Sequence, residues 1–122
     1  MRRYEKCMQE RRLEVRMLCA DMVEVCWKDR TGRDCRVMGL LEDIAHSGAC
    51  LQLETSIPMG TEIGWSCPKK KKKFEGYVRY CVYREIGYFV GVEFAPGSEW
   101  SKRQYKPQHL LDLNELMEKA KR

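Results

Sequence analysis

Two arginines stand four residues apart, just ahead of the first apolar run of the chain. These are Arg12 and Arg16, and Arg11 adds a third guanidinium directly beside the first. Residues at this spacing share a face in an extended segment and lie one turn apart on the same side of a helix. A guanidinium is a planar fork of donors, which suits groups that accept two hydrogen bonds at once, such as phosphate or the O6/N7 edge of guanine. The spacing therefore favours a site where two forks converge on one anionic ligand. A solvated basic arm is the alternative.

A second polar element follows a later apolar run, and it consists of Asp43-Ile44-Ala45-His46-Ser47-Gly48. Its carboxylate can accept hydrogen bonds from the N1–H and N2–H2 groups of a guanine, or from the local backbone in an Asx-type turn. Its glycine allows either a positive φ or a close approach of the backbone to a ligand. Together the two elements predict a receptor for a small, anionic ligand that carries guanine.

The remaining candidates for chemistry do not form a catalytic or metal site. The two histidines, His46 and His109, have no cysteine or serine partner at a recognised spacing. Seven cysteines are widely spaced without a Cys-x-x-Cys motif, which argues against zinc and against a disulfide framework. No glycine-rich phosphate loop is present. We therefore expect a protein that is not an enzyme, that uses no metal or cofactor, and whose cysteines are buried, reduced thiols of a cytoplasmic protein.

Composition indicates one globular domain that does not enter a membrane. The chain has 122 residues, of which 43% are hydrophobic, and this is enough to bury a single core. No apolar run approaches the roughly 18 residues of a membrane span. The charged N-terminus, with no apolar stretch behind it, argues against a secretory signal.

The positive charge is uneven and favours anionic partners. The net charge is +5, and the run Lys69–Lys73 carries five of the 23 basic residues. A nucleic-acid site would combine this run with aromatic residues on neighbouring strands, namely Trp65, Tyr77, Tyr80 and Tyr83. Trp65 and Tyr80 fall on the inward faces of their predicted strands, so we expect them in the core. Nucleic acid is therefore not the expected partner, and the lysines are expected to form a solvated loop.

Apolar residues alternate with polar ones over most of the chain, which is typical of β-strands. The alternation predicts strands at residues 17–28, 35–44, 49–54, 63–67, 74–83 and 88–94. Turn signals separate them, such as Asp29–Arg33 and Glu85–Gly87. Six short strands joined mainly by tight turns predict a closed or nearly closed antiparallel barrel, because closure removes exposed edges.

The two ends of the chain differ from this pattern. Leu110, Leu113, Met117 and Ala120 recur at helical spacing, which predicts an amphipathic C-terminal α-helix. The overall expectation is an all-β fold, a six-stranded antiparallel β-barrel with a C-terminal helix. An N-terminal arm over residues 1–16 would carry the arginines, and residues 17–122 would form the barrel and the helix.

The combination of motifs and elements resembles the PilZ domain family. It consists of Arg-x-x-x-Arg before the first strand, Asp-x-x-x-x-Gly after the second, a six-stranded barrel and a final helix. Gly91-Val92-Glu93-Phe94 is similar to the closing strand of that family. The resemblance runs from about Arg11 to the C-terminal helix. It implies a bacterial cytoplasmic receptor or adaptor that binds cyclic di-GMP and changes its surface to signal to a protein partner.

By this resemblance, Arg12 and Arg16 would hold the phosphates and the Hoogsteen edges of guanine, with Arg11 as a supplement. Asp43 would accept from a guanine Watson–Crick edge, and Gly48 would let the backbone approach the ligand. Ligand would draw the arginine arm onto the barrel.

Ala45 departs from the family pattern, which has serine at this position. A hydroxyl bonded to a charged phosphate contributes ~1.5–3 kcal/mol, or roughly 10- to 150-fold in affinity. We hypothesise that binding is weakened, with His46 or Ser47 as substitute donors from the same turn. The alternative is a PilZ-like interaction domain with weakened or lost cyclic di-GMP binding, which would work through its barrel surface or its C-terminal helix.

Overall fold

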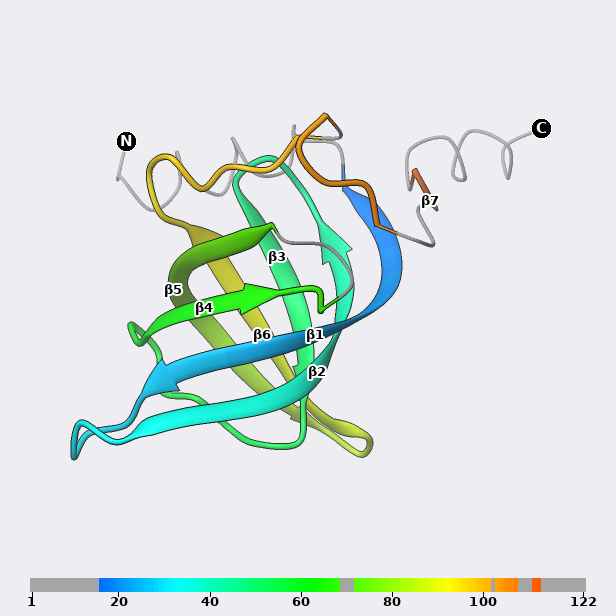
Figure 1. Ribbon diagram of the computed structural model, residues 1–122. Coiled ribbons are helices and arrows are strands. Elements are labelled where there is room, and N and C mark those ends of the chain that lie inside the picture. The colour runs from blue at the N-terminus through cyan, green and yellow to red at the C-terminus, as the bar shows by residue number, and fades with distance from the viewer. Residues whose placement is uncertain (1–15, 69–71, 102, 108–110, 113–122) are drawn as a thin grey trace, which may run out of the picture.

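The chain folds into a six-stranded antiparallel closed barrel (Figure 1). The structure is a computed structural model, and it describes residues 16–68, 72–101, 103–107 and 111–112. The six strands predicted from alternation are confirmed, and their bounds are β1 Met17–Lys28, β2 Asp34–Ile44, β3 Gly48–Leu53, β4 Glu62–Ser66, β5 Lys73–Arg84 and β6 Gly87–Phe94.

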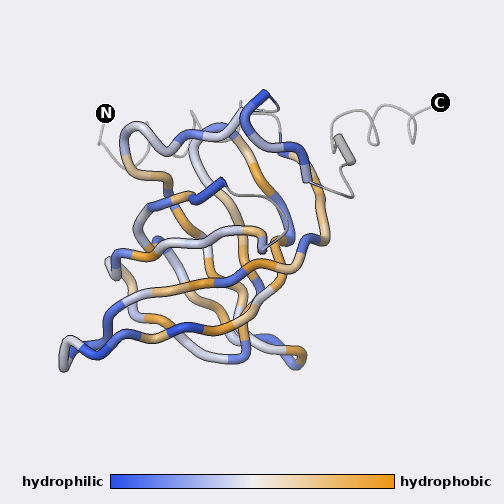
Figure 2. The backbone as a smooth tube through the Cα atoms, in the orientation of Figure 1, coloured by the Kyte–Doolittle hydropathy of each residue, from blue (hydrophilic) through white to orange (hydrophobic). Residues whose placement is uncertain are grey.

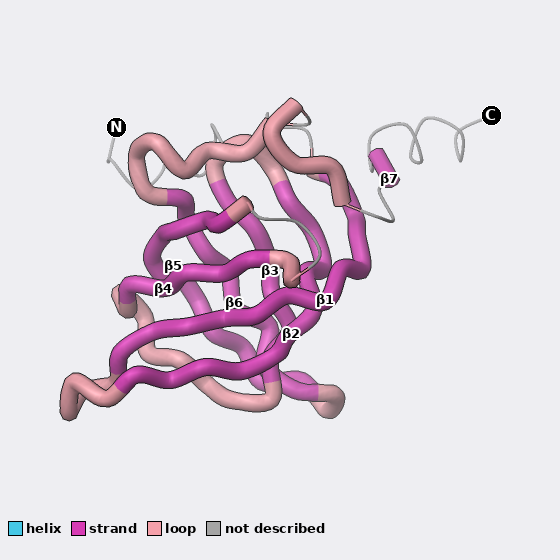
Figure 3. The backbone as a smooth tube through the Cα atoms, in the orientation of Figure 1, coloured by secondary structure: helices cyan, strands magenta, loops and turns pink. Residues whose placement is uncertain are grey.

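Each strand pairs with two neighbours. The order is β2-β3-β6-β5-β4-β1, and pairing between β1 and β2 closes the cylinder. The β1–β2 hairpin is the longest pairing, and a carboxylate orders its turn. Asp29 accepts hydrogen bonds of 2.9 Å from the backbone N–H groups of Thr31 and Arg33, while Gly32 takes a φ of 83°, which is unfavourable for residues with a side chain. In Figure 3 this hairpin extends beyond the neighbouring strands as two strands joined by a short loop.

The core is built from the inward residues of every strand and centres on a cluster of aromatic rings. The rings of Trp65 and Phe74 stack with centroids 4.5 Å apart, and Tyr105 meets Phe74 edge-on at 5.7 Å. The prediction that Trp65 is a core residue is confirmed, because its side chain is 1% exposed. The alternation of apolar and polar residues along the strands is visible in Figure 2.

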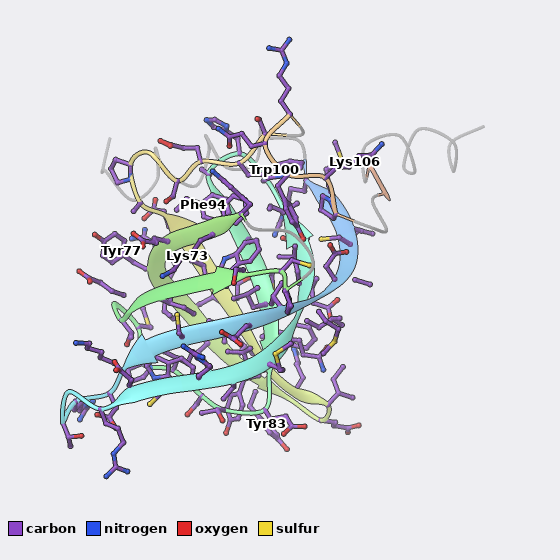
Figure 4. All side chains as sticks on the ribbon, viewed as in Figure 1. Lys73, Tyr77, Tyr83, Phe94, Trp100 and Lys106 are labelled. Atoms are coloured by element: carbon purple, nitrogen blue, oxygen red, sulfur yellow. The ribbon has the colours of Figure 1, made fainter. Side chains whose placement is uncertain are left out.

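A segment after β6 covers one end of the barrel, and sequence alternation did not predict it. Trp100 and Tyr105 are both buried there, and the indole Nε1–H of Trp100 donates to the backbone carbonyl of Tyr105 at 2.7 Å. The Tyr105 hydroxyl donates to the buried carboxylate of Asp21 at 2.7 Å. Figure 4 labels Phe94, the last residue of β6, together with Trp100 and Lys106 of this segment.

The predicted C-terminal helix is not part of the described structure. No helix occurs among the residues that the structure describes, and Leu111–Asp112 forms β7, a two-residue strand that pairs with Met17 and Leu18. The other predicted helix residues, Leu110, Leu113, Met117 and Ala120, lie outside the described residues, as do His109 and the arm residues 1–15. Within the described segments no helix is long and apolar enough to cross a membrane.

One expectation about β5 is wrong, because the strand contains a bulge. Tyr80 was expected on the inward face of this strand. Instead the register with β6 shifts between Val78 and Tyr80. An extra residue in one strand reverses the inward and outward faces beyond it. As a result Tyr80 and Val82 are exposed, whereas Cys81 packs against the core.

Candidate functional site

The structure brings together one residue from each of the two predicted elements. The guanidinium Nη2 of Arg16 lies 3.2 Å from Oδ2 and 3.4 Å from Oδ1 of Asp43, although the two residues are 27 positions apart. Arg16 immediately precedes β1, and Asp43 is the penultimate residue of β2. The side chain of Arg16 is 52% exposed and that of Asp43 is 19% exposed. The pair therefore presents its guanidinium to solvent and holds its carboxylate against the barrel wall.

Bulges in two strands bring the side chains of this site to one level of the outer wall. The β2–β3 register shifts between Leu41 and Asp43, and the β5–β6 register shifts between Val78 and Tyr80. Beyond these shifts the paired residues form one row across four strands, in the order Asp43, Cys50, Gly91 and Tyr80. The two bulges therefore place Asp43 and Tyr80 on the same outer face, on either side of β3 and β6.

Tyr80 reaches along this row because the intervening residue on β6 is a glycine. A Cβ at Gly91 would lie 2.0 Å from Cε2 of the tyrosine ring, so any other residue would occupy the space of the ring. The hydroxyl of Tyr80 donates a hydrogen bond to the sulfur of Cys50. Cys50 is buried, although it lies on the outer side of β3 and is not part of the core cluster.

Burial sets the electrostatics of this row. Desolvation raises the pKa of Asp43, and two effects oppose it in part, the charge and hydrogen bond of Arg16 and the hydrogen bond from the Cys50 backbone N–H. Desolvation also raises the pKa of the Cys50 thiol to about 11 and that of the Tyr80 hydroxyl to about 12. Glu42 has a raised pKa for the same reason, with a further contribution from Asp43. The charge of Arg16 thus offsets part of the effect of burial on the pKa of Asp43.

The turn after Asp43 is closed by its own backbone. The N–H of Ala45 donates to the carbonyl of Gly48 at 2.8 Å, and the side chain of Ala45 is 7% exposed. Gly48 does not have a positive φ, contrary to one expectation for it. A side chain at position 48 would collide with β6, because its Cβ would stand 2.4 Å from the backbone oxygen of Val92.

The two polar residues of the turn, His46 and Ser47, form hydrogen bonds with the segment after β6 and with the end of β6. His46 and Trp100 make two contacts: the backbone N–H of Trp100 donates to the carbonyl of His46 at 3.0 Å, and Nδ1 of His46 lies 3.1 Å from the carbonyl of Trp100. A carbonyl only accepts, so Nδ1 carries the proton, and Nε2 is the ring nitrogen that remains for a ligand. The carbonyl of Ser47 accepts from the N–H of Phe94 at 2.8 Å. The turn is therefore bonded to the covering segment through His46 and to the end of β6 through Ser47.

Sequence reasoning missed three members of this surface. Two residues that it did predict lie outside the described residues. Arg11 and Arg12 belong to the latter group. Cys50, Tyr80 and Gly91 were not predicted as site residues, because strict alternation gives no sign of a bulge. The sequence drew attention to Tyr80 only as an aromatic residue near the run Lys69–Lys73, and it was expected in the core.

Other kinds of site receive no support from the described part of the chain. It contains no group of three or more histidine, cysteine, aspartate or glutamate residues that could hold a metal ion. Its six cysteines are free thiols, of which Cys19, Cys50 and Cys67 are buried. Neither a protein-family model nor a curated protein matches the sequence.

Proposed function

We propose that this protein is a PilZ-type receptor module that binds cyclic di-GMP and transmits binding to a protein partner. The observation that supports this best is the contact between Arg16 and Asp43 across 27 positions, at 3.2 Å. It joins a guanidinium fork for phosphate or the guanine Hoogsteen edge to a carboxylate for the guanine Watson–Crick edge. Neither group alone selects a guanine nucleotide, whereas the two together offer complementary partners for its base and its phosphates.

Ligand binding on this surface is an exchange of partners. In the structure Asp43 already accepts from Arg16, so a guanine that donates its N1–H and N2–H2 groups to Asp43 replaces the guanidinium. Arg16 is then available for a phosphate of the same ligand. The ring of Tyr80, which is 39% exposed, provides an aromatic surface in the same row for a base to pack against.

The arm is the moving part of the proposed receptor. Arg12 would bind the ligand together with Arg16, and Arg11 would supplement them, so that residues 1–16 become ordered on the barrel when ligand arrives. The partner would recognise the surface made by arm and barrel together. In this role the protein acts in the bacterial cytoplasm, carries out no reaction and needs no metal or cofactor.

A second candidate function is a PilZ-like interaction domain that has lost most of its affinity for the nucleotide. Ala45 supports this candidate, because it is buried in the turn and supplies no hydroxyl for a phosphate. His46 is a limited substitute, since its Nδ1 is held by the carbonyl of Trp100. A partner captured equally well with and without cyclic di-GMP would favour this second candidate.

Titration calorimetry with cyclic di-GMP tests the proposal on the full chain. Arg16→Ala and Asp43→Ala should each weaken binding by about tenfold or more, because each removes a charge-assisted hydrogen bond. Arg36→Ala is the matched control: its guanidinium also pairs with a carboxylate on the outer wall, that of Glu24, at 3.4 Å. Binding that is unchanged in the two site variants, or absent in the wild type, would reject cyclic di-GMP as the ligand.

A further inference from the structure

Among the described residues, the first half of β2 has a strand partner on only one side. It pairs with β1 from Asp34 onward, whereas its ladder with β3 begins at Leu40. Over residues 34–38 it makes no backbone hydrogen bond to any described segment other than β1. Successive residues of a strand direct their N–H and C=O groups to opposite sides. This stretch is therefore an open sheet edge, and Figure 1 shows β2 continuing past the end of β3.

A glycine explains why β3 leaves this edge open. A Cβ at Gly39 would lie 2.3 Å from Cδ2 of Leu53 and 2.9 Å from the backbone oxygen of Gln52. Leu53 is the last residue of β3, and its side chain is buried in the core. The chain thus crosses closely over Gly39 and continues as the loop to β4, away from β2. The opening is a consequence of core packing.

A groove runs beside the open edge. It has a volume of about 1370 Å³, and it is lined by Asp34, Cys35 and Arg36 of β2, by residues of β1, β4 and β5, and by Thr55, Ser56 and Pro58 of the loop between β3 and β4. Ligand sites for small molecules usually have volumes of roughly 300–1,000 Å³. Where this groove adjoins residues 34–36, it leaves room for an added chain next to the unpaired backbone groups.

The side chains along the edge define what such a chain must present. Asp34, Arg36 and Met38 are exposed, whereas Cys35 and Val37 are half-buried on the inner side. Val37 packs against the core together with Trp27, Cys81 and Tyr88. A strand added here would place every second side chain over this apolar rim and the others in solvent. The edge therefore favours a peptide in which apolar and polar residues alternate.

The charge near this edge favours a partner peptide over a second copy of this chain as its occupant. Residues 28–36 contain four basic residues and two acidic ones. Two copies that paired through their β2 edges would bring these basic hairpins together, and like charges oppose such pairing. A peptide with acidic ends experiences attraction at the same place.

We propose that residues 34–38 of β2 form a docking edge for an acidic, extended segment of a partner protein, which joins the barrel wall as an additional strand. Main-chain hydrogen bonds would provide the affinity, and the rim at Val37 would select alternating apolar side chains. This surface is separate from Arg16 and Asp43, so cyclic di-GMP binding is not required for it.

NMR titration of the full-length, ¹⁵N-labelled protein tests this edge. The probe is the synthetic peptide Ac-Glu-Val-Thr-Val-Thr-Val-Glu-NH2. We expect amide shift changes and slower hydrogen exchange to centre on residues 34–38. Two further peptides carry N-methyl groups, one on its valines and the other on its threonines. Only one of these residue sets directs its N–H groups to β2, so one peptide should bind about tenfold or more weakly and the other should bind like the probe.

A charge variant provides an independent measurement. Arg36→Glu should weaken binding of the acidic probe several-fold. The matched variant Arg79→Glu should not, because Arg79, which also pairs with a carboxylate, lies on β5 and not along this edge. Shift changes that centre on other strands, or equal effects of the two N-methylated peptides, would overturn the proposal. It would also be overturned by shifts at residues 34–38 that depend on protein concentration without peptide, since these would identify a second copy as the occupant.

Discussion

The ring of Tyr80 occupies the space that a side chain on Gly91 would need. The two residues are paired across β5 and β6, and a Cβ at position 91 would lie 2.0 Å from one ring carbon and 2.4 Å from two others. This lets the phenol cross β6 and donate a hydrogen bond to Cys50 on β3. The outer wall beside Asp43 is therefore shaped by the absence of one side chain.

Gly91→Ala should displace this ring from the wall. Because the ring is partly exposed, it can rotate away, so we expect a loss of about 1–3 kcal/mol in the free energy of unfolding, as for other overpacked sites. The pKa of Tyr80 should fall from about 12 toward the ordinary value of 10, because burial is the main cause of its elevation. Urea unfolding and an NMR titration of ¹³C-labelled tyrosines measure the two effects.

Gly64→Ala is the matched control for this substitution. Its added Cβ would approach the flexible end of Lys73 at 3.2 Å, and its next contacts, the Sγ of Cys26 at 3.5 Å and the backbone oxygen of Phe74 at 3.6 Å, are ordinary van der Waals contacts. We expect little change in stability and no change in the titration of Tyr80. An unchanged Tyr80 pKa in Gly91→Ala would contradict the role assigned to the glycine.

The limits of sequence-based prediction in this chain follow from the bulges. Alternation placed all six strands and identified Trp65 as buried. It failed for Tyr80, because one additional residue in β5 reverses the faces of the strand and leaves no trace in the hydrophobic pattern. The contact between Arg16 and Asp43 follows from the antiparallel pairing of β1 and β2, which sets Met17 opposite Ile44.

The covering segment was unpredictable for another reason. Residues 95–107 have neither strand nor helix periodicity, so nothing in their order indicates that Trp100 and Tyr105 are buried. Their position depends on bonds to distant residues, such as the hydrogen bond from Tyr105 to Asp21 across 84 positions. Contacts of this kind are decided by the assembled barrel.

Asp43→Asn should stabilise the protein at neutral pH in the absence of ligand. Burial raises the pKa of Asp43 in the folded state despite Arg16, so the unfolded chain releases this proton first as pH rises. The folded protein therefore loses stability from the ordinary pKa of 3.8 upward, until Asp43 is ionised in both states. Asparagine avoids this loss, and we expect a gain within about 1 kcal/mol at pH 7 that disappears near pH 3.

Urea unfolding from pH 3 to pH 7 measures this difference. Arg16→Ala is the informative companion, because it removes the charge that lowers the Asp43 pKa and should steepen the loss of stability with rising pH. If Arg16→Ala and the wild type show the same pH dependence, the ion pair does not act on Asp43 in solution.

Tyr105→Phe should destabilise the protein by about 1–3 kcal/mol, because it removes a donor to the buried carboxylate of Asp21. The variant should also change the response to alkali. Burial raises the pKa of Tyr105 above its ordinary value of 10, with a further contribution from Asp21. The unfolded chain then ionises first, and stability falls as pH rises above 10.

Comparing urea midpoints at pH 8 and pH 11 tests this prediction. The wild type should lose more stability between the two values than Tyr105→Phe does. Tyr83→Phe is the control, since Tyr83 is 66% exposed on β5. An equal alkaline loss in all three proteins would show that Tyr105 ionises in the folded state as readily as in the unfolded chain.

Ala45→Ser should raise the affinity for cyclic di-GMP. The residue lies in the turn that follows Asp43, and its backbone N–H already donates to Gly48 at 2.8 Å, so the new hydroxyl would extend from an ordered backbone. If that hydroxyl reaches a phosphate, the gain is roughly 10- to 150-fold.

Ala49→Ser is a close control, because both alanines are 7% exposed but only Ala49 belongs to the core cluster. The control should lose stability without gaining affinity, and calorimetry on both variants separates the outcomes. Equal affinities for wild type and Ala45→Ser would mean that the wild-type turn already supplies the missing donor from Ser47 or from Nε2 of His46.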